Sequence, residues 1–124
     1  MTEQKTSDAQ VAAKPRVFVV QEMFQHDITG AMRYGEVVPL LPSNAQVAFS
    51  PYPIIRTLRR KLMKMRPDDY LLLTGDPVLI GLCCSIAAMY NGGVYRVLKW
   101  DKRERLYIPI TLDITEKGER DADV

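Results

Sequence analysis

The sequence predicts an α/β fold: a single compact domain with a β-α-β-α-β core, additional antiparallel edge strands and a C-terminal hairpin. Strand-like apolar runs alternate with two helical patterns in the middle of the chain. The length of 124 residues suits one domain, and 47% hydrophobic with 26% charged residues is typical of globular proteins. Both ends are polar. We therefore expect an α/β domain at residues 16–112, between mobile tails at 1–15 and 113–124.

The first half of the chain predicts short strands. Residues 16–22 (RVFVVQE) are rich in β-branched side chains and predict a strand. Residues 23–33 show no clean period and predict a loop. Residues 34–41 (YGEVVPLL) predict a second strand, in which Pro39 should lie at a sheet edge or near a strand end because proline lacks the N–H of a ladder. Residues 45–50 (AQVAFS) predict a third, short strand.

A basic amphipathic helix is predicted at residues 53–66, with Pro53 in its first turn and Pro67 as its stop. At 100° per residue, its apolar side chains fall in one arc, with Met63 as an exception on the other side. The members of the arc are Ile54, Ile55, Leu58, Leu62 and Met65. Basic residues fill the remainder, so the polar face has a single sign.

The second half of the chain predicts a buried strand, an apolar helix and a hairpin. Residues 70–74 form a continuous apolar run, as in a central parallel strand. Asp76 is expected to cap a helix at 78–90, which ends at a pair of glycines. Two further strands, at 94–100 and 105–112, are joined by a charged turn and predict an antiparallel pair.

The net charge of +2 is unevenly distributed. Residues 1–50 carry four basic and five acidic side chains (net −1), residues 51–112 carry eleven and five (+6), and residues 113–124 carry two and five (−3). The positive middle indicates an anionic partner, either nucleic acid or an acidic protein. The alternative is that these lysines and arginines only solubilise exposed surfaces.

The candidate binding residues lie on the basic helix and on the hairpin, where aromatic side chains accompany the charges. This combination suits phosphate pairing and base stacking, although no recognised nucleic-acid-binding motif is present. The candidates are Arg56, Arg59, Arg60, Lys61, Lys64 and Arg66 on the helix, and Arg96, Lys99, Trp100, Lys102, Arg103 and Arg105 on the hairpin. The alternative is a solvated face with Trp100 packed inward.

The helix at 78–90 is apolar on every side, so one of its faces needs cover other than the sheet. That cover comes either from neighbouring parts of the chain or from another subunit. We expect a homo-oligomer. Its interface is predicted at a strip of small residues that permits close helix approach, formed by Gly81, Cys84, Ser85 and Ala88.

An enzymatic function has weaker support. The chain contains neither a GxGxxG nor a GxxxxGK[ST] phosphate loop, and its single histidine, His26, cannot build a metal site alone. We expect no cofactor and no metal. Cys83 and Cys84 are predicted to be buried packing residues, and they indicate a reducing compartment. The remaining alternative is a small Mg²⁺-dependent enzyme that uses Asp76 and Asp101.

Three segments resemble a set of small, uncharacterised α/β proteins of tailed bacteriophages. They are DDYLLLTGDPVLIGLCCSIAA at 68–88, NGGVYRVLKWDKRERLYIPITLDI at 91–114 and RVFVVQE at 16–22. The resemblance implies a phage origin and expression in the host bacterial cytoplasm, but it carries over no functional residue. The chain also lacks a signal-peptide layout and a membrane-length apolar run.

The sequence therefore predicts a non-enzymatic, oligomeric phage accessory protein that binds nucleic acid or another acidic macromolecular surface. The alternative from another class is a protein–protein interaction module, either an inhibitor of a host enzyme or a component of the virion.

Overall fold

The computed structural model describes residues 14–116, so most of both predicted tails lies outside the described residues. Along the chain, the elements are β1 (Arg16–Gln21), the 3₁₀ helix η1 (Thr29–Tyr34), β2 (Glu36–Leu41), α2 (Pro51–Leu62), β3 (Tyr70–Leu72), α3 (Pro77–Tyr90), β4 (Val94–Asp101) and β5 (Leu106–Asp113). Neither α-helix of this part of the chain has the length and hydropathy that a membrane crossing requires.

The five strands form one mixed sheet in the order β2-β1-β3-β4-β5. The first four strands in this order run parallel, and β5 pairs antiparallel with β4. The predicted α/β class and the C-terminal hairpin are confirmed. The antiparallel edge strands predicted in addition to the hairpin are wrong, since β1 and β2 run parallel to their neighbours. The edge position predicted from Pro39 is also confirmed, since β2 is an outer strand.

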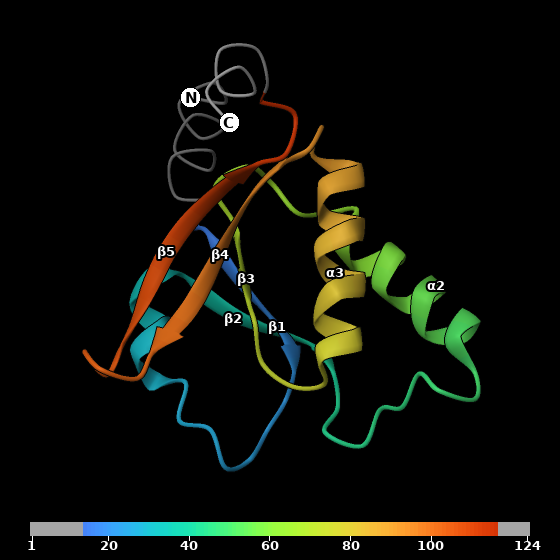
Figure 1. The fold of residues 1–124 in the computed structure, drawn as a ribbon, viewed down its shortest axis with the longest axis horizontal. Coiled ribbons are helices and arrows are strands. Elements are labelled where there is room, and N and C mark those ends of the chain that lie inside the picture. Colours follow the sequence, from blue (N-terminus) through green and yellow to red (C-terminus); the bar gives the residue numbers. More distant parts are fainter. Residues whose placement is uncertain (1–13, 117–124) are drawn as a thin grey trace, which may run out of the picture.

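The two faces of the sheet are covered differently (Figure 1). Both α2 and α3 pack on one face, where Leu58, Leu62, Leu79 and Ile86 meet strand residues such as Phe18 in the larger core. The opposite face carries a smaller core, which η1 and the segment before it cover. This second face is the one that builds the candidate site.

The register of β4 and β5 decides which residues reach that second face. Side chains alternate along a strand, so Val97 of β4 faces the helices while Leu98 and Trp100 point the other way. Trp100 pairs with Tyr107 of β5 in the antiparallel ladder. The two aromatic rings therefore lie on the same face of the sheet.

The strand predicted at residues 45–50 is wrong, because this segment is a loop. The position beside β3 is occupied by β1 and β4, so the sheet offers no place for it there. The side chain of Gln21 also holds the start of the segment, donating to the carbonyl oxygens of Pro42, Ser43 and Ala45 at 3.2 Å each. Local propensity is overruled by these tertiary contacts.

Helix α2 begins and ends earlier than predicted. Pro51 stands at its first position and Met63 is its C-cap residue, so Lys64 and Arg66 follow the helix. The predicted apolar arc is confirmed by the complete burial of Leu58 and Leu62.

The predicted cap of α3 is confirmed as well. Asp76 Oδ1 accepts a hydrogen bond of 2.8 Å from the backbone N–H of Val78.

Candidate nucleic-acid interface

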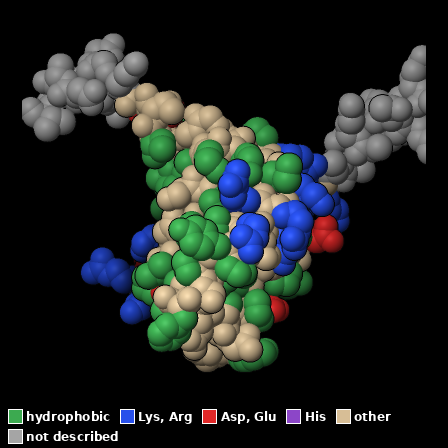
Figure 2. Space-filling model, turned by 90° about the vertical axis from the view of Figure 1, so that its right-hand side faces the viewer, with side chains coloured by type: hydrophobic (Ala, Val, Ile, Leu, Met, Phe, Trp, Pro, Cys, Tyr) green, Lys and Arg blue, Asp and Glu red, His purple; other side chains and the backbone are tan. Residues whose placement is uncertain are grey.

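Helix α2 and the residue that follows its C-cap present a row of exposed cations. Arg56, Arg60 and Lys64 are four residues apart and exposed, and we name them the α2 stripe. Arg59 is exposed too, and its Nε donates to the Tyr90 hydroxyl at 3.3 Å. Figure 2 looks onto the side of the molecule that carries α2 and shows Lys and Arg side chains gathered on it. No acidic side chain of residues 14–113 forms an ion pair with these four cations.

Lys61 and Arg66, which the sequence also predicts as binding residues, are used inside the protein. The Lys61 ammonium donates to the carbonyl oxygen of Leu40 at 2.8 Å, which ties α2 to β2. Arg66 donates to the carbonyl oxygen of Lys14 at 2.7 Å and forms an ion pair of 3.4 Å with Asp69. Both charges therefore serve the fold.

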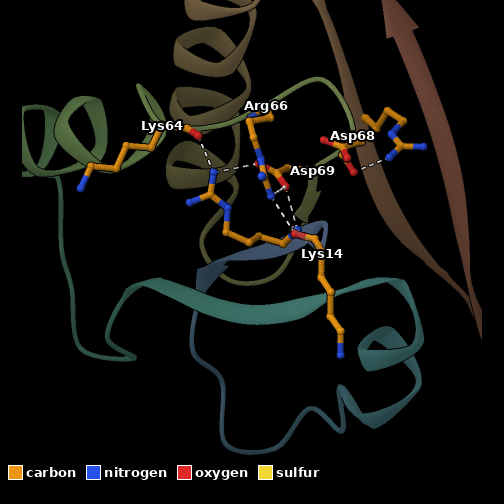
Figure 3. Close-up of polar contacts among 7 residues, drawn as sticks. Lys14, Lys64, Arg66, Asp68 and Asp69 are labelled. Carbon is orange, nitrogen blue, oxygen red and sulfur yellow. Dashed lines mark hydrogen bonds and ion pairs between the residues drawn. The ribbon is translucent and has the colours of Figure 1, made fainter. Parts of the chain in front are cut away.

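Asp69 is the centre of this internal cluster (Figure 3). Its carboxylate is fully buried and accepts from the backbone N–H groups of Arg16 at 2.7 Å and Arg66 at 2.8 Å. The guanidinium of Arg16 adds an ion pair at 3.1 Å and also contacts the Lys64 carbonyl oxygen. Burial alone would raise the pKa of Asp69, but these donors outweigh it and hold the pKa below its ordinary value.

Arg96 is also fixed by neighbouring groups. Its guanidinium lies 4.1 Å from the ring centroid of Tyr70 and donates to the carbonyl oxygen of Asp68. It is half-buried on the sheet face opposite the helices. Arg96 therefore supports the second face rather than offering a free cation.

The turn between β4 and β5 is ordered by hydrogen bonds, and its basic side chains are exposed to solvent. Asp101 Oδ1 accepts from the backbone N–H groups of Arg103 at 2.9 Å and Glu104 at 3.2 Å. Arg105 takes a left-handed conformation with φ of 57°, which is strained for a residue other than glycine. Lys102, Arg103 and Arg105 are all exposed, as is Lys99 on the strand.

A groove of about 640 Å³ opens beside this turn, and we name it the hairpin groove. Trp100, Lys102 and Arg105 line it from the hairpin. Asp27 and Arg33 line it from the segment that leads into η1 and from η1 itself. This second wall could not be predicted from the sequence, because residues 23–33 lack periodicity and lie far from the hairpin in the chain. Tyr34, Tyr107 and His26 also line the groove.

Aromatic contacts and hydrogen bonds fix the two walls to each other. The Tyr34 hydroxyl donates to the Tyr107 carbonyl oxygen at 3.2 Å, and the Tyr107 hydroxyl donates to the Asp27 carbonyl oxygen at 3.3 Å. Burial, with the nearby Asp27 charge, raises the pKa of Tyr107, so this hydroxyl stays protonated. The Trp100 and Tyr107 rings meet edge to face at a centroid distance of 4.9 Å. The groove is therefore formed before any ligand arrives.

The α2 stripe and the hairpin groove are separate surfaces. Helix α2 packs near β2 on the sheet face that both α-helices cover. The hairpin is at the opposite edge of the sheet, and its groove opens on the other face. Figure 1 shows α2 and the β4–β5 turn on opposite sides of the molecule. The two predicted basic sets thus do not merge into one patch.

A crevice lies between β1 and β3, where the strand order reverses. Open α/β sheets bind ligands at such points. Here the Gln21 side chain occupies the floor of the crevice, since its Oε1 accepts from the Asp76 N–H at 2.9 Å. A Cβ on Gly75 would lie 2.4 Å from the same Oε1. A groove of about 750 Å³ remains open above this floor, between Gly75 and Asp76 on one side and the loop before α2 on the other, and no cationic side chain of residues 14–116 lines it.

The two carboxylates of the enzyme alternative are both engaged locally, Asp76 with the Val78 N–H and Asp101 with the turn. No group of three His, Cys, Asp or Glu side chains with metal-binding geometry occurs within residues 14–116. Cys83 is buried, and burial raises the pKa of its thiol to about 12. Burial also raises the pKa of Cys84.

The predicted oligomer strip is partly exposed. Gly81 and Ser85 lie on the open side of α3, and the Ser85 hydroxyl donates to the Gly81 carbonyl oxygen at 3.0 Å. Cys84 and Ala88 are half-buried and pack against the larger core.

These observations define a small single-domain α/β protein with a mixed five-stranded sheet and two basic surfaces. The chain belongs to the phage Pam3 gp32-like protein family, whose family model matches residues 15–114. The phage resemblance expected from the sequence is thereby confirmed. No curated protein and no solved structure matches the chain.

Proposed function

We propose that this phage protein is a non-enzymatic accessory protein of the host bacterial cytoplasm that binds nucleic acid through the hairpin, with the α2 stripe as a second contact. One observation supports the proposal above all. The exposed cations of both surfaces have no ion-pair partner among the acidic side chains of residues 14–113. Like charges four residues apart on a helix cost a few tenths of a kcal/mol each. A polyanion would remove this repulsion.

The expected binding is mainly electrostatic. A cation that neutralises a phosphate releases a condensed counterion, so the logarithm of the affinity falls linearly with the logarithm of salt concentration. The slope is about 0.9 per phosphate for duplex DNA and about 0.7 for single strands. The slope therefore counts the contacts that each surface makes.

Fluorescence anisotropy of labelled single-stranded and duplex oligonucleotides at several salt concentrations tests the proposal. We compare Lys102→Glu/Arg103→Glu on the hairpin with Arg56→Glu/Arg60→Glu on the α2 stripe. All four side chains are exposed, so both variants should fold. Each reversal should weaken binding and flatten the salt slope, with the larger effect from the hairpin.

Lys14→Glu is the matched control, because Lys14 is an exposed lysine outside both surfaces. It should change neither the affinity nor the slope by more than the loss of one distant charge. Oligonucleotide binding that is absent at low salt, or equal in all four proteins, would contradict the proposal.

We further propose that the protein self-associates through the open side of α3. Val78 and Met89 are about 60% exposed there, and they flank Gly81 and Ser85. Association would remove this apolar surface from water. Gly81→Glu should then reduce the mass measured by light scattering. A monomeric mass for the unmodified protein at tens of micromolar would overturn self-association.

A protein–protein interaction module is a second candidate function, favoured by two aromatic side chains. Phe24 and Phe49 are 90% and 91% exposed, on loops that follow β1 and precede α2. Aromatic side chains, phenylalanine among them, are enriched in protein–protein interfaces relative to the rest of the protein surface. Phe24→Ser/Phe49→Ser should abolish binding to a protein partner and leave oligonucleotide affinity unchanged.

A further inference from the structure

The exposed part of Trp100 borders the hairpin groove. The indole is 42% exposed although it lies beside the buried Tyr107 ring. Exposed tryptophan in a groove formed in advance provides a flat stacking surface with little loss of side-chain entropy. Because every nucleobase has a π-face, such a surface binds bases with little regard to sequence.

Cations surround this stacking surface from both walls. Lys102 and Arg105 come from the turn, and Arg33 comes from η1, where its guanidinium lies 5.5 Å from the Tyr34 ring centroid. One carboxylate, Asp27, also lines the groove, and its Oδ1 accepts from the Thr29 N–H at 2.9 Å. The lining therefore carries an excess of positive charge around an aromatic surface.

The size of the groove fits one nucleotide. Its 640 Å³ lies inside the range of about 300–1,000 Å³ that small-molecule sites occupy. A base that stacks on Trp100 places its flanking phosphates toward the rim, where the cations lie. A base inside a duplex is paired and stacked on its neighbours, so it must be unstacked before it can enter.

We propose that the hairpin groove is a base-binding site for single-stranded nucleic acid, in which one unpaired base stacks on Trp100 and its phosphates contact Lys102, Arg105 and Arg33. This inference rests on the proposed nucleic-acid binding. It adds two features that binding by charge alone would not require. They are a preference for single strands and a phosphate contact from Arg33 in η1.

Trp100 is the only tryptophan of the chain, so its fluorescence reports on this site alone. We titrate the unmodified protein with a dT oligonucleotide, a duplex of the same length and inorganic polyphosphate, which is a polyanion without bases. The dT oligonucleotide should quench Trp100, whereas polyphosphate should compete for the cations without quenching. Duplex should bind more weakly than the single strand at the same salt concentration.

Two variants test the stacking directly by anisotropy. Trp100→Leu should lower affinity for dT by roughly 5- to 150-fold, the range of one base–aromatic stack. Trp100→Phe keeps an aromatic ring beside Tyr107 and should lose less. If Trp100→Leu melts below the assay temperature, the stacking is tested by the affinity of Trp100→Phe together with the quenching titration of the unmodified protein.

A matched control moves the fluorophore. In Phe49→Trp/Trp100→Phe the single tryptophan stands at an exposed loop position outside both the hairpin groove and the α2 stripe. This tryptophan should not be quenched by dT to the extent that Trp100 is. Oligonucleotide binding without quenching of Trp100 and with full affinity in Trp100→Leu would overturn the base-binding site and leave the proposed function intact. If neither dT nor polyphosphate binds, both proposals fail.

Discussion

Replacement of Asp69 by asparagine should destabilise the fold by about 3 kcal/mol. The two backbone N–H donors bind different carboxylate oxygens, Arg16 N at Oδ1 and Arg66 N at Oδ2. Asparagine offers one acceptor oxygen, so one buried N–H loses its partner, at a cost of about 1–3 kcal/mol. The ion pairs add about 1 kcal/mol, since both arginine side chains are partly exposed.

The acid dependence of this difference follows from the lowered pKa of Asp69. A carboxyl whose folded pKa lies below its unfolded value stabilises the protein above the unfolded pKa. That contribution is lost as pH falls through the ordinary value of 3.8 toward the folded pKa. The gap between the unmodified protein and Asp69→Asn should therefore be full at pH 7 and shrink below about pH 4.

Urea unfolding followed by the Trp100 fluorescence measures both effects, and Asp68→Asn is the control. Asp68 is the exposed neighbour, and its backbone carbonyl, which the substitution keeps, makes the contact with Arg96. Asp68→Asn should cost less than about 0.5 kcal/mol. Equal midpoints for the two variants, or a gap that widens in acid, would refute the reasoning.

Three further predictions test other parts of the structure. Arg105→Gly should keep stability within about 1 kcal/mol or raise it, because the left-handed backbone strains arginine; an oligonucleotide titration should nevertheless show weaker binding. Gly81→Ala should raise the free energy of unfolding by about 0.8 kcal/mol, since nothing lies near an added Cβ. In contrast, Gly75→Ala should lower it by about 3 kcal/mol, since φ is +104° and Gln21 blocks the Cβ; equal melting temperatures for these two alanine variants would be a contradiction. Cys83 should resist a thiol reagent at pH 8 in the native protein, since burial raises its pKa to about 12; native-state labelling as fast as in urea would disprove this.

The elements that the sequence predicted correctly carry their own local signals. Helix α3 has an Asp cap and glycines after its end, and both are used as expected. Strands β4 and β5 have apolar alternation and a short charged turn, so their pairing follows from neighbouring residues. Local patterns are sufficient where the partner is adjacent in the chain.

The remaining features depend on contacts that are distant in sequence. Residues 45–50 have strand propensity, but the sheet has no place for them beside β3. Lys61 and Arg66 resemble free surface cations until the carbonyl oxygens of Leu40 and Lys14 are placed next to them. Composition cannot distinguish a cation that binds a ligand from one that binds a backbone carbonyl.

The hairpin groove shows the same limit for the candidate site. The sequence predicted Trp100, Lys102 and Arg105 as binding residues, and the structure places all three on one groove. It could not predict Arg33, because the loop and 3₁₀ helix that carry it have no periodic pattern. Only the fold brings this wall to the hairpin, through hydrogen bonds between Tyr34, Tyr107 and the segment before η1.

Ultraviolet cross-linking of the unmodified protein to a single-stranded oligonucleotide, followed by mass spectrometry of the peptides, tests the central claim most directly. The covalent adduct locates the bound base without any substitution in the protein. We predict adducts on peptides that contain Trp100 or Tyr107, and their loss when unlabelled single strand is added in excess. Adducts confined to α2, or none at a concentration where anisotropy shows binding, would contradict a base-binding site in the hairpin groove.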